Sequence, residues 1–255
     1  MIARPERIVS LVPSLTEGLF VLGLGDRVVG VTDWCVHPAR GVAGLPKVGG
    51  TKTPDLAAIR ALRPDLVIAN REENRRTDVE RLQRDGLHVW VTDPRTVRGG
   101  AELLAEVAAL GAGADRTRAV VEPTLAAVTR AAEAPATGPV RVFCPIWRDP
   151  WMVPGPDTYI HDLIALCGGT SPFVGLEDRR YPRLELDAVV AAAPDVILLP
   201  DEPYSFGPAD ARELGRLPVP AARTGRIHLI DGTLVSWYGP RIREAVETLC
   251  GLLAP

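Results

Sequence analysis

This chain of 255 residues is poor in several features, and each shortage excludes a class of protein. It has no run of basic residues, only two lysines (Lys47 and Lys52) and a net charge of −3, which argues against a nucleic-acid partner. It has no unbroken apolar run of the roughly 18 residues that a membrane-spanning helix needs. None of its four cysteines forms a Cys-x-x-Cys pair, so the common zinc-finger and redox motifs are absent. The remaining composition, 46% hydrophobic and 24% charged, is typical of a well-packed globular protein.

The cysteines and the first residues bear on the compartment. The cysteines are Cys35, Cys144, Cys167 and Cys250. Their mostly apolar flanks predict small buried side chains, and a disulfide stays open because a sequence does not show which pairs lie close. The opening MIARPERIVSLVPS shows no charged and apolar leader with a cleavage site. We therefore expect a cytoplasmic protein, with a periplasmic or extracytoplasmic location as the alternative if a leader was trimmed.

The sequence repeats itself. LAAIRALRPDLVIAN (56–70) resembles LDAVVAAAPDVILLP (186–200), and both read as a helix, a Pro-Asp pair and a buried strand. The strands lack alternation, as parallel strands covered on both faces should. The order strand, helix, helix, strand, strand, helix occurs twice, and in the first copy Ser14 with Glu17 predicts a capping box at the helix start.

Two such repeats predict an α/β fold of two lobes, each a parallel sheet flanked by helices. We expect an N-terminal lobe over 1–112, a linker helix over 113–139 and a C-terminal lobe over 140–255. The linker is alanine-rich and reads as helical until Pro135, with Pro123 expected to kink or interrupt it. Because ligands of open parallel sheets bind beyond the carboxyl ends of the strands, a ligand cleft between the lobes is expected.

Aromatic residues make up only 5% of the chain, yet four of the five tryptophans fall in predicted loops at strand ends. These four are Trp34, Trp147, Trp151 and Trp237, whereas Trp90 lies within a predicted strand. An indole offers a broad apolar surface with one N–H donor, so such a set suits a large, flat, mostly uncharged ligand. Trp147 is expected to form one half of an aromatic clamp opposite Trp34, and Trp151 to wall the pocket or brace the next helix.

Polar and phenolic side chains follow the same strands and are further candidates for ligand contact. They are Asn70, Arg71, Arg148, Arg241, Tyr181 and Tyr238. Such groups can hydrogen-bond amides or carboxylates at the rim of a ligand. For the charged run 70–76, a solvated helix start is the open alternative.

The sequence offers little for catalysis. It has no nucleophile elbow, P-loop or dinucleotide-binding fingerprint. Cys35 and His37 could supply two metal ligands, and Asp201 with Glu202 could do acid–base work, but no further partner is evident for either pair. We therefore predict no catalytic residues, no metal site, no cofactor and no enzymatic activity, with an enzyme acting on the ligand as the less favoured alternative.

Four stretches, in their order and spacing, cover nearly the whole chain. They are RIVSLVPSLTEGLFVLGLGDRVVGVTDWCVHP, KVGGTKTPDLAAIRALRPDLVIANREEN, DTYIHDLIALCGGTSPF and SWYGPRI. Together they resemble the class III solute-binding proteins, the helical-backbone metal receptors, and most of all the cobalamin-binding BtuF-like branch. The resemblance implies a metal-chelate ligand: cobalamin, haem or an iron siderophore.

The resemblance also implies residue roles. It places Trp34, Thr51, Asn70, Trp147 and Trp237 at pocket positions of the cobalamin binders, although Thr51 and Asn70 stand where that branch commonly has an aromatic residue. Importing members carry an acidic residue on each lobe that docks on permease arginines. Those positions are Asp187 and Ala57 here, and Asp55, two residues from the second, is expected to dock on the permease together with Asp187.

Three functions follow from the sequence. The first is a binding protein for cobalamin or a related corrinoid in an ABC importer, and the second is a cytosolic binder or carrier of a metal chelate without a permease. The third is the enzyme named above. The expected partners are a small-molecule metal chelate and an ABC permease, with no nucleic acid, and the protein is expected to be a monomer.

Overall fold

The computed structural model describes residues 4–134, 138–175 and 180–254, and these residues form two compact units. Unit 1 comprises Met1–Pro94, Gly99–Leu125 and Tyr238–Pro240. Unit 2 comprises Arg95–Arg98, Ala126–Trp237 and Arg241–Pro255. Within the described part of the chain, no helix combines the length and apolar character needed to cross a membrane.

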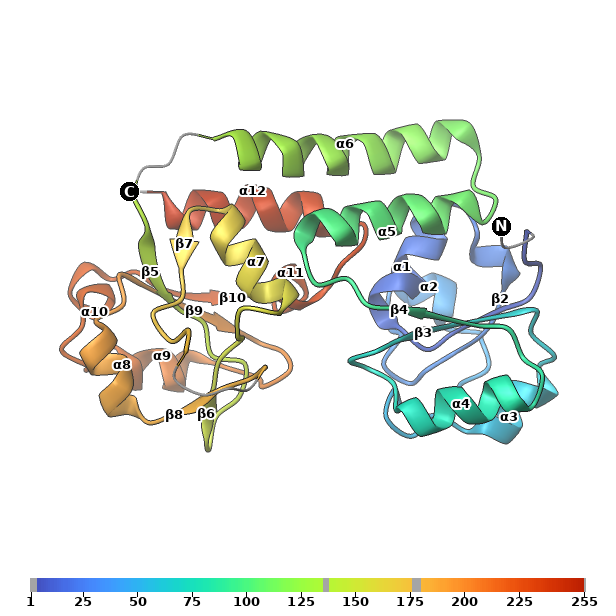
Figure 1. The fold of residues 1–255 in the computed structure, drawn as a ribbon, viewed down its shortest axis with the longest axis horizontal. Helices are drawn as coiled ribbons and strands as arrows, with labels where there is room; N and C mark the ends of the chain where they lie inside the picture. The colour runs from blue at the N-terminus through green and yellow to red at the C-terminus, as the bar shows by residue number, and fades with distance from the viewer. Residues whose placement is uncertain (1–3, 135–137, 176–179, 255) are drawn as a thin grey trace. The chain divides into compact units, whose positions relative to one another are not determined.

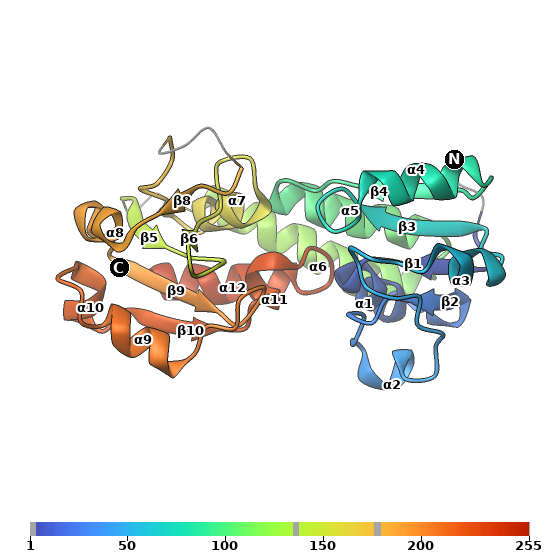
Figure 2. The same cartoon turned by 90° about the horizontal axis from the view of Figure 1, so that it is seen from below.

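A parallel four-stranded sheet forms the middle of unit 1, with the strand order β2-β1-β3-β4 (Figure 2). Its strands are β1 (Ile8–Ser10), β2 (Val28–Val31), β3 (Leu66–Asn70) and β4 (Val89–Thr92). The register pairs Ile8 with Leu66 across β1 and β3. All five residues of β3 are buried, which explains its uninterrupted apolar sequence.

Helices cover both faces of this sheet (Figure 1). They are α1 (Pro13–Val21), α2 (Ala39–Val42), α3 (Leu56–Ala61), α4 (Arg76–Arg84) and most of α5 (Val97–Ala109), with a 3₁₀ turn at Gly25–Arg27. α3 and α4 lie on one face, and α1 and α5 on the other. On the first face, Ile59 of α3 and Leu82 of α4 pack on Val9 and Val67 of the sheet.

Unit 2 repeats this plan with the strand order β10-β9-β5-β7, all parallel. Its strands are β5 (Val140–Phe143), β7 (Gly169–Thr170), β9 (Val196–Pro200) and β10 (Ile227–Ile230). Two further strands, β6 (Trp151–Met152) and β8 (Arg183–Leu184), form a separate antiparallel pair. Because β7, β5, β9 and β10 correspond to β2, β1, β3 and β4, both units share one topology.

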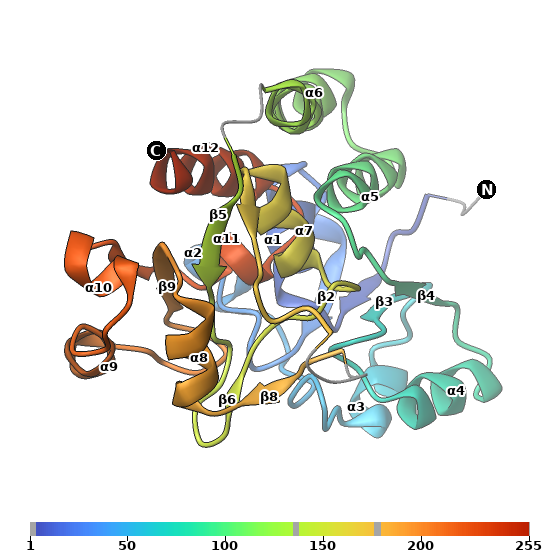
Figure 3. The ribbon, with the colours of Figure 1, turned by 60° about the vertical axis from the view of Figure 1, so that its left-hand side comes forward.

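Helices also cover both faces of the second sheet (Figures 1 and 3). They are α7 (Tyr159–Leu166), α8 (Leu186–Ala192), α9 (Pro208–Leu214), α10 (Pro220–Thr224), α11 (Thr233–Ser236) and α12 (Ile242–Leu253). α7, α11 and α12 pack together on one face, and α8, α9 and α10 lie on the other.

The repeated Pro-Asp pairs perform the same structural task in both units. Asp65 accepts the backbone N–H of Arg7 (3.0 Å), and Asp195 accepts that of Arg141 (3.0 Å), so each aspartate fixes the start of the central strand. The Arg141 guanidinium also holds the Asp195 carboxylate, and this hydrogen bond lowers the pKa of Asp195. The predicted order of helix, Pro-Asp pair and strand is therefore confirmed. The aspartate of each pair recurs because its carboxylate holds the backbone at the start of the central strand.

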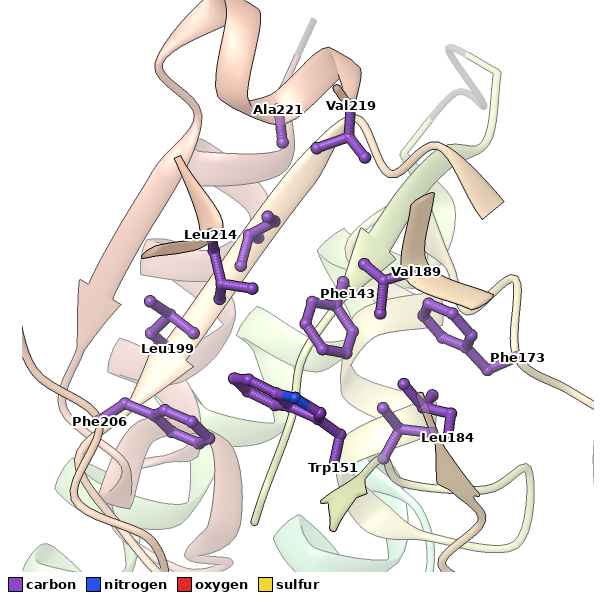
Figure 4. Packing of buried hydrophobic residues seen from close by; sticks show 12 residues of the cluster. Phe143, Trp151, Phe173, Leu184, Val189, Leu199, Phe206, Leu214, Val219 and Ala221 are labelled. Atoms are coloured by element: carbon purple, nitrogen blue, oxygen red, sulfur yellow. The ribbon is translucent and has the colours of Figure 1, made fainter. Parts of the chain in front are cut away.

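The core of unit 2 is built around aromatic rings (Figure 4). Trp151 stacks on Phe206 with ring centroids 5.9 Å apart and an interplanar angle of 6°, and it also contacts Phe143. Phe143 packs edge-on against Phe173 at 5.5 Å. Aliphatic residues of α8, α9, β8 and β9 enclose these rings.

Two local predictions were wrong. α1 begins at Pro13, not Ser14, and its N-cap is Val12, so no capping box forms there; proline suits the first helical position because its missing N–H needs no partner. Pro123 does not interrupt α6 (Ala114–Glu133), which is one 20-residue helix. The helix ends at Glu133, and Pro135 lies outside the described residues. The two compact units divide within α6, between Leu125 and Ala126, and the predicted domain bounds stay a prediction.

Candidate ligand-binding site

Trp34 stands on an anchored turn after β2 in unit 1, and its side chain is 65% exposed. The next residue, Cys35, is fully buried, and its thiol contacts the hydroxyls of Thr16 and Thr32 at 3.1 Å. Burial raises the pKa of the Cys35 thiol, so this cysteine is a packed anchor rather than a reactive group. Lys47 secures the turn from outside by donating to the Thr32 and Cys35 carbonyls. An exposed indole on so constrained a turn presents a fixed apolar surface.

Thr51 lies beside Trp34 in a second tight loop. A Cβ on Gly50 would lie 3.7 Å from the indole Nε1 of Trp34, so the ring lies next to this loop. Gly49 has a φ of +83°, and a Cβ there would meet the Thr53 carbonyl at 2.8 Å, so only glycine fits. The Thr51 carbonyl accepts a hydrogen bond from Asn74 (3.0 Å). The Trp34 indole therefore lies beside the loop that carries Thr51, and contact of either residue with a ligand stays a prediction.

Asn70 has a different surrounding from the one expected of a ligand contact. It is buried, with 2% of its surface exposed. Its side-chain oxygen accepts the backbone N–H groups of Glu72 and Glu73, and its Nδ2 donates to Thr92. Contact with a ligand would require breaking these bonds, so Asn70 shapes the loop after β3. Arg71 does extend outward, and it pairs with Asp93 at 3.3 Å.

In unit 2, the stretch from Trp147 to Met152 is a hairpin. The Ile146 N–H donates to the Met152 carbonyl, and the Met152 N–H donates to the Trp147 carbonyl. Because side chains alternate along a strand, Trp151 points to the opposite face from Met152 and its partner Trp147. Asp149, with a φ of +58°, forms the turn between the two tryptophans. One short hairpin therefore sends one indole into the core and the other outward.

The outward indole, Trp147, is 44% exposed and has an aromatic neighbour. Tyr204 packs edge-on against it, with ring centroids 5.8 Å apart. Tyr204 in turn contacts Phe206, whose centroid lies 4.6 Å away. The Trp147 ring is therefore supported by residues that follow β9. Trp151 was also predicted to contact a ligand, but its side chain lies in the core and is only 6% exposed.

Arg148 binds other side chains of unit 2 and is not a free group at the rim of a pocket. Its guanidinium donates to the carboxylates of Asp210 and Glu213, the latter at 2.8 Å. It also lies over the Trp151 ring, 5.2 Å from the centroid. Ligand binding by Arg148, as predicted from the sequence, would compete with both ion pairs and the ring contact.

Asp210 gives unit 2 a defined pH dependence. Burial acts to raise its pKa, but the Gly207 N–H and the Arg148 guanidinium outweigh it and hold the pKa below the ordinary aspartate value. The stability that these bonds contribute is present above the ordinary aspartate pKa and is lost as the pH falls through the folded-state value. Asp210→Asn should lower the free energy of unfolding at pH 7 by about 2 kcal/mol and flatten its decline below about pH 4.

Urea unfolding at pH 7 and pH 3 measures this effect. The matched control is Glu213→Gln, because Glu213 is 42% exposed and should contribute less. An Asp210→Asn protein that loses as much stability on acidification as the wild type would contradict the assignment.

The loop after β10 carries the candidates Trp237, Tyr238 and Arg241, which are divided between the two units. Trp237 is half-buried, and Arg241 lies over its ring at 5.0 Å while donating to the Thr233 hydroxyl (2.6 Å). Tyr238 belongs to unit 1, is 5% exposed and donates its hydroxyl to Glu73 at 2.8 Å. Burial and the Glu73 carboxylate raise the pKa of Tyr238 well above its usual value. Tyr238 is therefore an internal tie of unit 1, not an exposed contact.

The remaining candidates lie just before strand β8 or at helix starts. Tyr181 is half-buried beside Pro182, whose carbonyl accepts the Val153 N–H at 3.1 Å. Asp187 is exposed in the first turn of α8. Asp55 is exposed as well, but one carboxylate oxygen caps α3 by accepting the N–H groups of Ala57 and Ala58.

The groups considered for catalysis are used structurally. Asp201 accepts the Gly232 N–H (2.7 Å), and Glu202 accepts the Ser236 hydroxyl (2.9 Å), so both carboxylates hold α11. Cys35 is buried, as described above. Among the described residues, no group of three or more His, Cys, Asp or Glu side chains could hold a metal ion.

Sequence reasoning places Tyr204 beside a loop of the ligand-facing edge but does not select it as a ligand contact, and it misses Asn74. Tyr204 stands at the end of a repeated strand, as Trp147 does, and this shared position was the available signal. Asn74 accepts the Asn70 N–H at 2.7 Å and donates to the Thr51 carbonyl, a role that no local pattern indicates.

Known proteins resemble this chain in both sequence and fold. The sequence matches the family described as periplasmic binding protein over residues 8–233. A vitamin B12-binding protein of Pectobacterium atrosepticum is 25% identical over 99% of this chain and 90% of its own length. The periplasmic vitamin B12-binding protein BtuF of Vibrio cholerae has a similar fold, with a TM-score of 0.82 and 22% identity over 98% of this chain and 97% of that one. The periplasmic heme-binding protein RhuT from Roseiflexus sp. RS-1 gives a TM-score of 0.78 and 26% identity over 97% of each chain.

These similarities correct the expected location. The matching family and both solved relatives are periplasmic, so the expectation of a cytoplasmic protein is not supported and the periplasmic alternative is favoured. They confirm the two-lobed α/β fold and the resemblance to the BtuF-like branch.

Proposed function

The chain belongs to the periplasmic binding protein family, and from this premise we propose that it is the substrate-binding component of an ABC importer for a metal chelate. Its relatives are binding proteins and not enzymes, which confirms the prediction of no enzymatic activity. The preferred ligand in this proposal is cobalamin or a related corrinoid. The cytosolic carrier is not favoured, because the relatives are periplasmic.

One observation carries the proposal: Trp147 is 44% exposed on a hairpin whose other indole fills the core. A large apolar ring left in solvent is unfavourable by about 25 cal/mol for each Å² of surface, unless a ligand covers it. Trp34 shows the same property in unit 1, at 65% exposure. We propose each indole as a contact for the flat face of a chelate.

The metal-binding side chains of the described residues favour a ligand whose metal is already held by a chelating ring. A free ion would need a cluster of protein ligands, and the described residues hold none. A corrinoid supplies its own metal ligands, so apolar rings and a few hydrogen bonds suffice to bind it. The vitamin B12-binding relative supports this choice.

Haem is the second candidate because of Tyr204. A phenolate can serve as an axial ligand of haem iron, Tyr204 is partly exposed beside Trp147, and one relative binds heme. Tyr204→Phe separates the two candidates: it should abolish the charge-transfer spectrum of a tyrosinate–haem complex and leave corrinoid affinity unchanged.

Tryptophan-fluorescence titration with cobalamin, cobinamide, haem and a ferric siderophore tests the proposal. We expect a corrinoid to bind with a Kd below about 10 μM, roughly −7 kcal/mol. Co²⁺ alone is the matched control and should not bind. If none of the four chelates binds in this range, the proposed function is wrong; if only haem binds, the corrinoid preference is wrong.

Docking to a permease is proposed to depend on Asp187. Asp187→Ala should reduce ligand-stimulated ATP hydrolysis by the cognate ABC transporter in proteoliposomes about tenfold, because an exposed charge that meets an arginine is lost. Ligand affinity should not change.

Asp55→Ala tests the second docking candidate in the same assay. It removes the cap of α3 and should lower the free energy of unfolding by about 1 kcal/mol. If Asp187→Ala leaves ligand-stimulated ATP hydrolysis unchanged, Asp187 does not take part in docking.

A further inference from the structure

The 147–152 hairpin rests on the segment that follows β9. On the outer side of the hairpin, Tyr204 packs edge-on against Trp147 with ring centroids 5.8 Å apart. On its inner side, Phe206 stacks on Trp151 with ring centroids 5.9 Å apart (Figure 4). Both supporting rings come from one short stretch of chain. Any bond that fixes the hairpin to this stretch therefore also fixes the direction of the Trp147 indole.

Arg148 supplies two such bonds. Because side chains alternate along a strand, Arg148 points to the opposite side of the hairpin from Trp147. Its guanidinium donates to Asp210, which is 7% exposed, and to Glu213 at 2.8 Å. Asp210 is itself held in place, because it also accepts the Gly207 N–H at 2.9 Å. The residue next to Trp147 is therefore tied to α9 by two ion pairs.

Trp147 needs such a tie more than a core residue does. Its side chain is 44% exposed, so packing restricts its orientation only in part. Consecutive Cα atoms lie about 3.8 Å apart, so fixing the backbone at Arg148 also restricts the backbone of Trp147. A ring that is already held in its bound orientation loses less conformational entropy when a ligand covers it.

We propose that Arg148 is a positioning residue for ligand binding. Its ion pairs with Asp210 and Glu213 hold the hairpin on α9, and this presents the Trp147 indole to the ligand in one orientation. The inference rests on the proposed function, because it requires that Trp147 meets a chelate. Arg148 acts through Trp147 in this role and does not touch the ligand.

Isothermal titration calorimetry with cyanocobalamin, or with haem where only haem binds the wild type, measures the effect. Arg148→Met keeps an apolar stem but removes both ion pairs, and it should raise the Kd about tenfold. Glu213→Gln is the milder second variant, because Glu213 is 42% exposed and only one ion pair is lost. It should raise the Kd about threefold.

A double-mutant cycle with Trp147 separates positioning from direct contact and from a general loss of structure. In the Trp147→Ala protein, Arg148→Met should change the Kd by less than about twofold, because the indole that Arg148 positions is gone. A direct contact between Arg148 and the ligand would instead give the full loss in both proteins.

Arg141→Met is the matched control. Arg141 lies in the same unit, at the start of β5 rather than beyond its end, and donates to Asp195 at 2.9 Å and 3.0 Å. This variant also loses an arginine that holds a carboxylate, so it should lower the free energy of unfolding. It should leave the Kd unchanged, because Arg141 does not hold the hairpin.

Three results would each overturn the proposal while the wild type still binds a chelate. They are an unchanged Kd in both Arg148→Met and Glu213→Gln, a tenfold effect of Arg148→Met that persists in the Trp147→Ala protein, and a comparable rise in Kd from Arg141→Met. A wild-type protein that binds no chelate would overturn the proposed function, and this inference with it.

Discussion

Replacing Trp151 with alanine is expected to lower the free energy of unfolding of unit 2 by about 3–5 kcal/mol. The indole is 6% exposed, stacks on Phe206 and contacts Phe143, so its removal leaves a cavity that these aromatic rings cannot close by small shifts (Figure 4). Arg148 also loses the ring beneath its guanidinium. Urea unfolding followed by circular dichroism measures the loss.

The matched control for this prediction is Trp147→Ala, four positions away on the same hairpin. Trp147 is half exposed, so its removal should lower the free energy of unfolding by less than about 1 kcal/mol. Equal losses for the two variants would contradict the assignment of one indole to the core and the other to the surface.

Replacing Trp147 with alanine is expected to raise the Kd for the bound chelate about 10- to 100-fold. Covering the exposed part of an indole with an apolar ligand face is worth roughly 1–3 kcal/mol, and each 1.4 kcal/mol changes Kd about tenfold. Isothermal titration calorimetry is the suitable measurement, because the substitution itself alters the fluorescence.

Trp147→Phe should keep most of the affinity, since a smaller aromatic ring still packs on Tyr204 and on a flat ligand. The outcome that would reject this role is a fall in stability as large as that of Trp151→Ala, combined with unchanged affinity. Trp34→Ala provides an independent test in unit 1 by the same method.

The repeat was readable in the sequence because its parts are local. Helix, Pro-Asp pair and strand follow one another within a few residues. The buried strands β3 and β9 are recognisable in the sequence by their apolar runs. From these, the two parallel sheets and the strand ends that carry Trp34 and Trp147 could be predicted.

The fate of individual side chains depended on contacts that no local pattern reveals. Trp151 entered the core because its two-residue strand pairs with Leu184 in another two-residue strand. Arg148 meets Asp210 across 62 positions, and Tyr238 meets Glu73 across 165. Each was predicted to contact a ligand from its place after a strand, and each instead ties distant parts of its own unit together.

The central claim is that the exposed indole of the 147–152 hairpin binds the flat face of a corrinoid. A crystal structure of the protein with cyanocobalamin, with the cobalt located by anomalous scattering, tests this most directly. The account predicts a single cobalt site with the corrin ring against the Trp147 indole and with Trp151 unchanged in the core. A corrinoid bound elsewhere, with Trp147 still facing solvent, would contradict it.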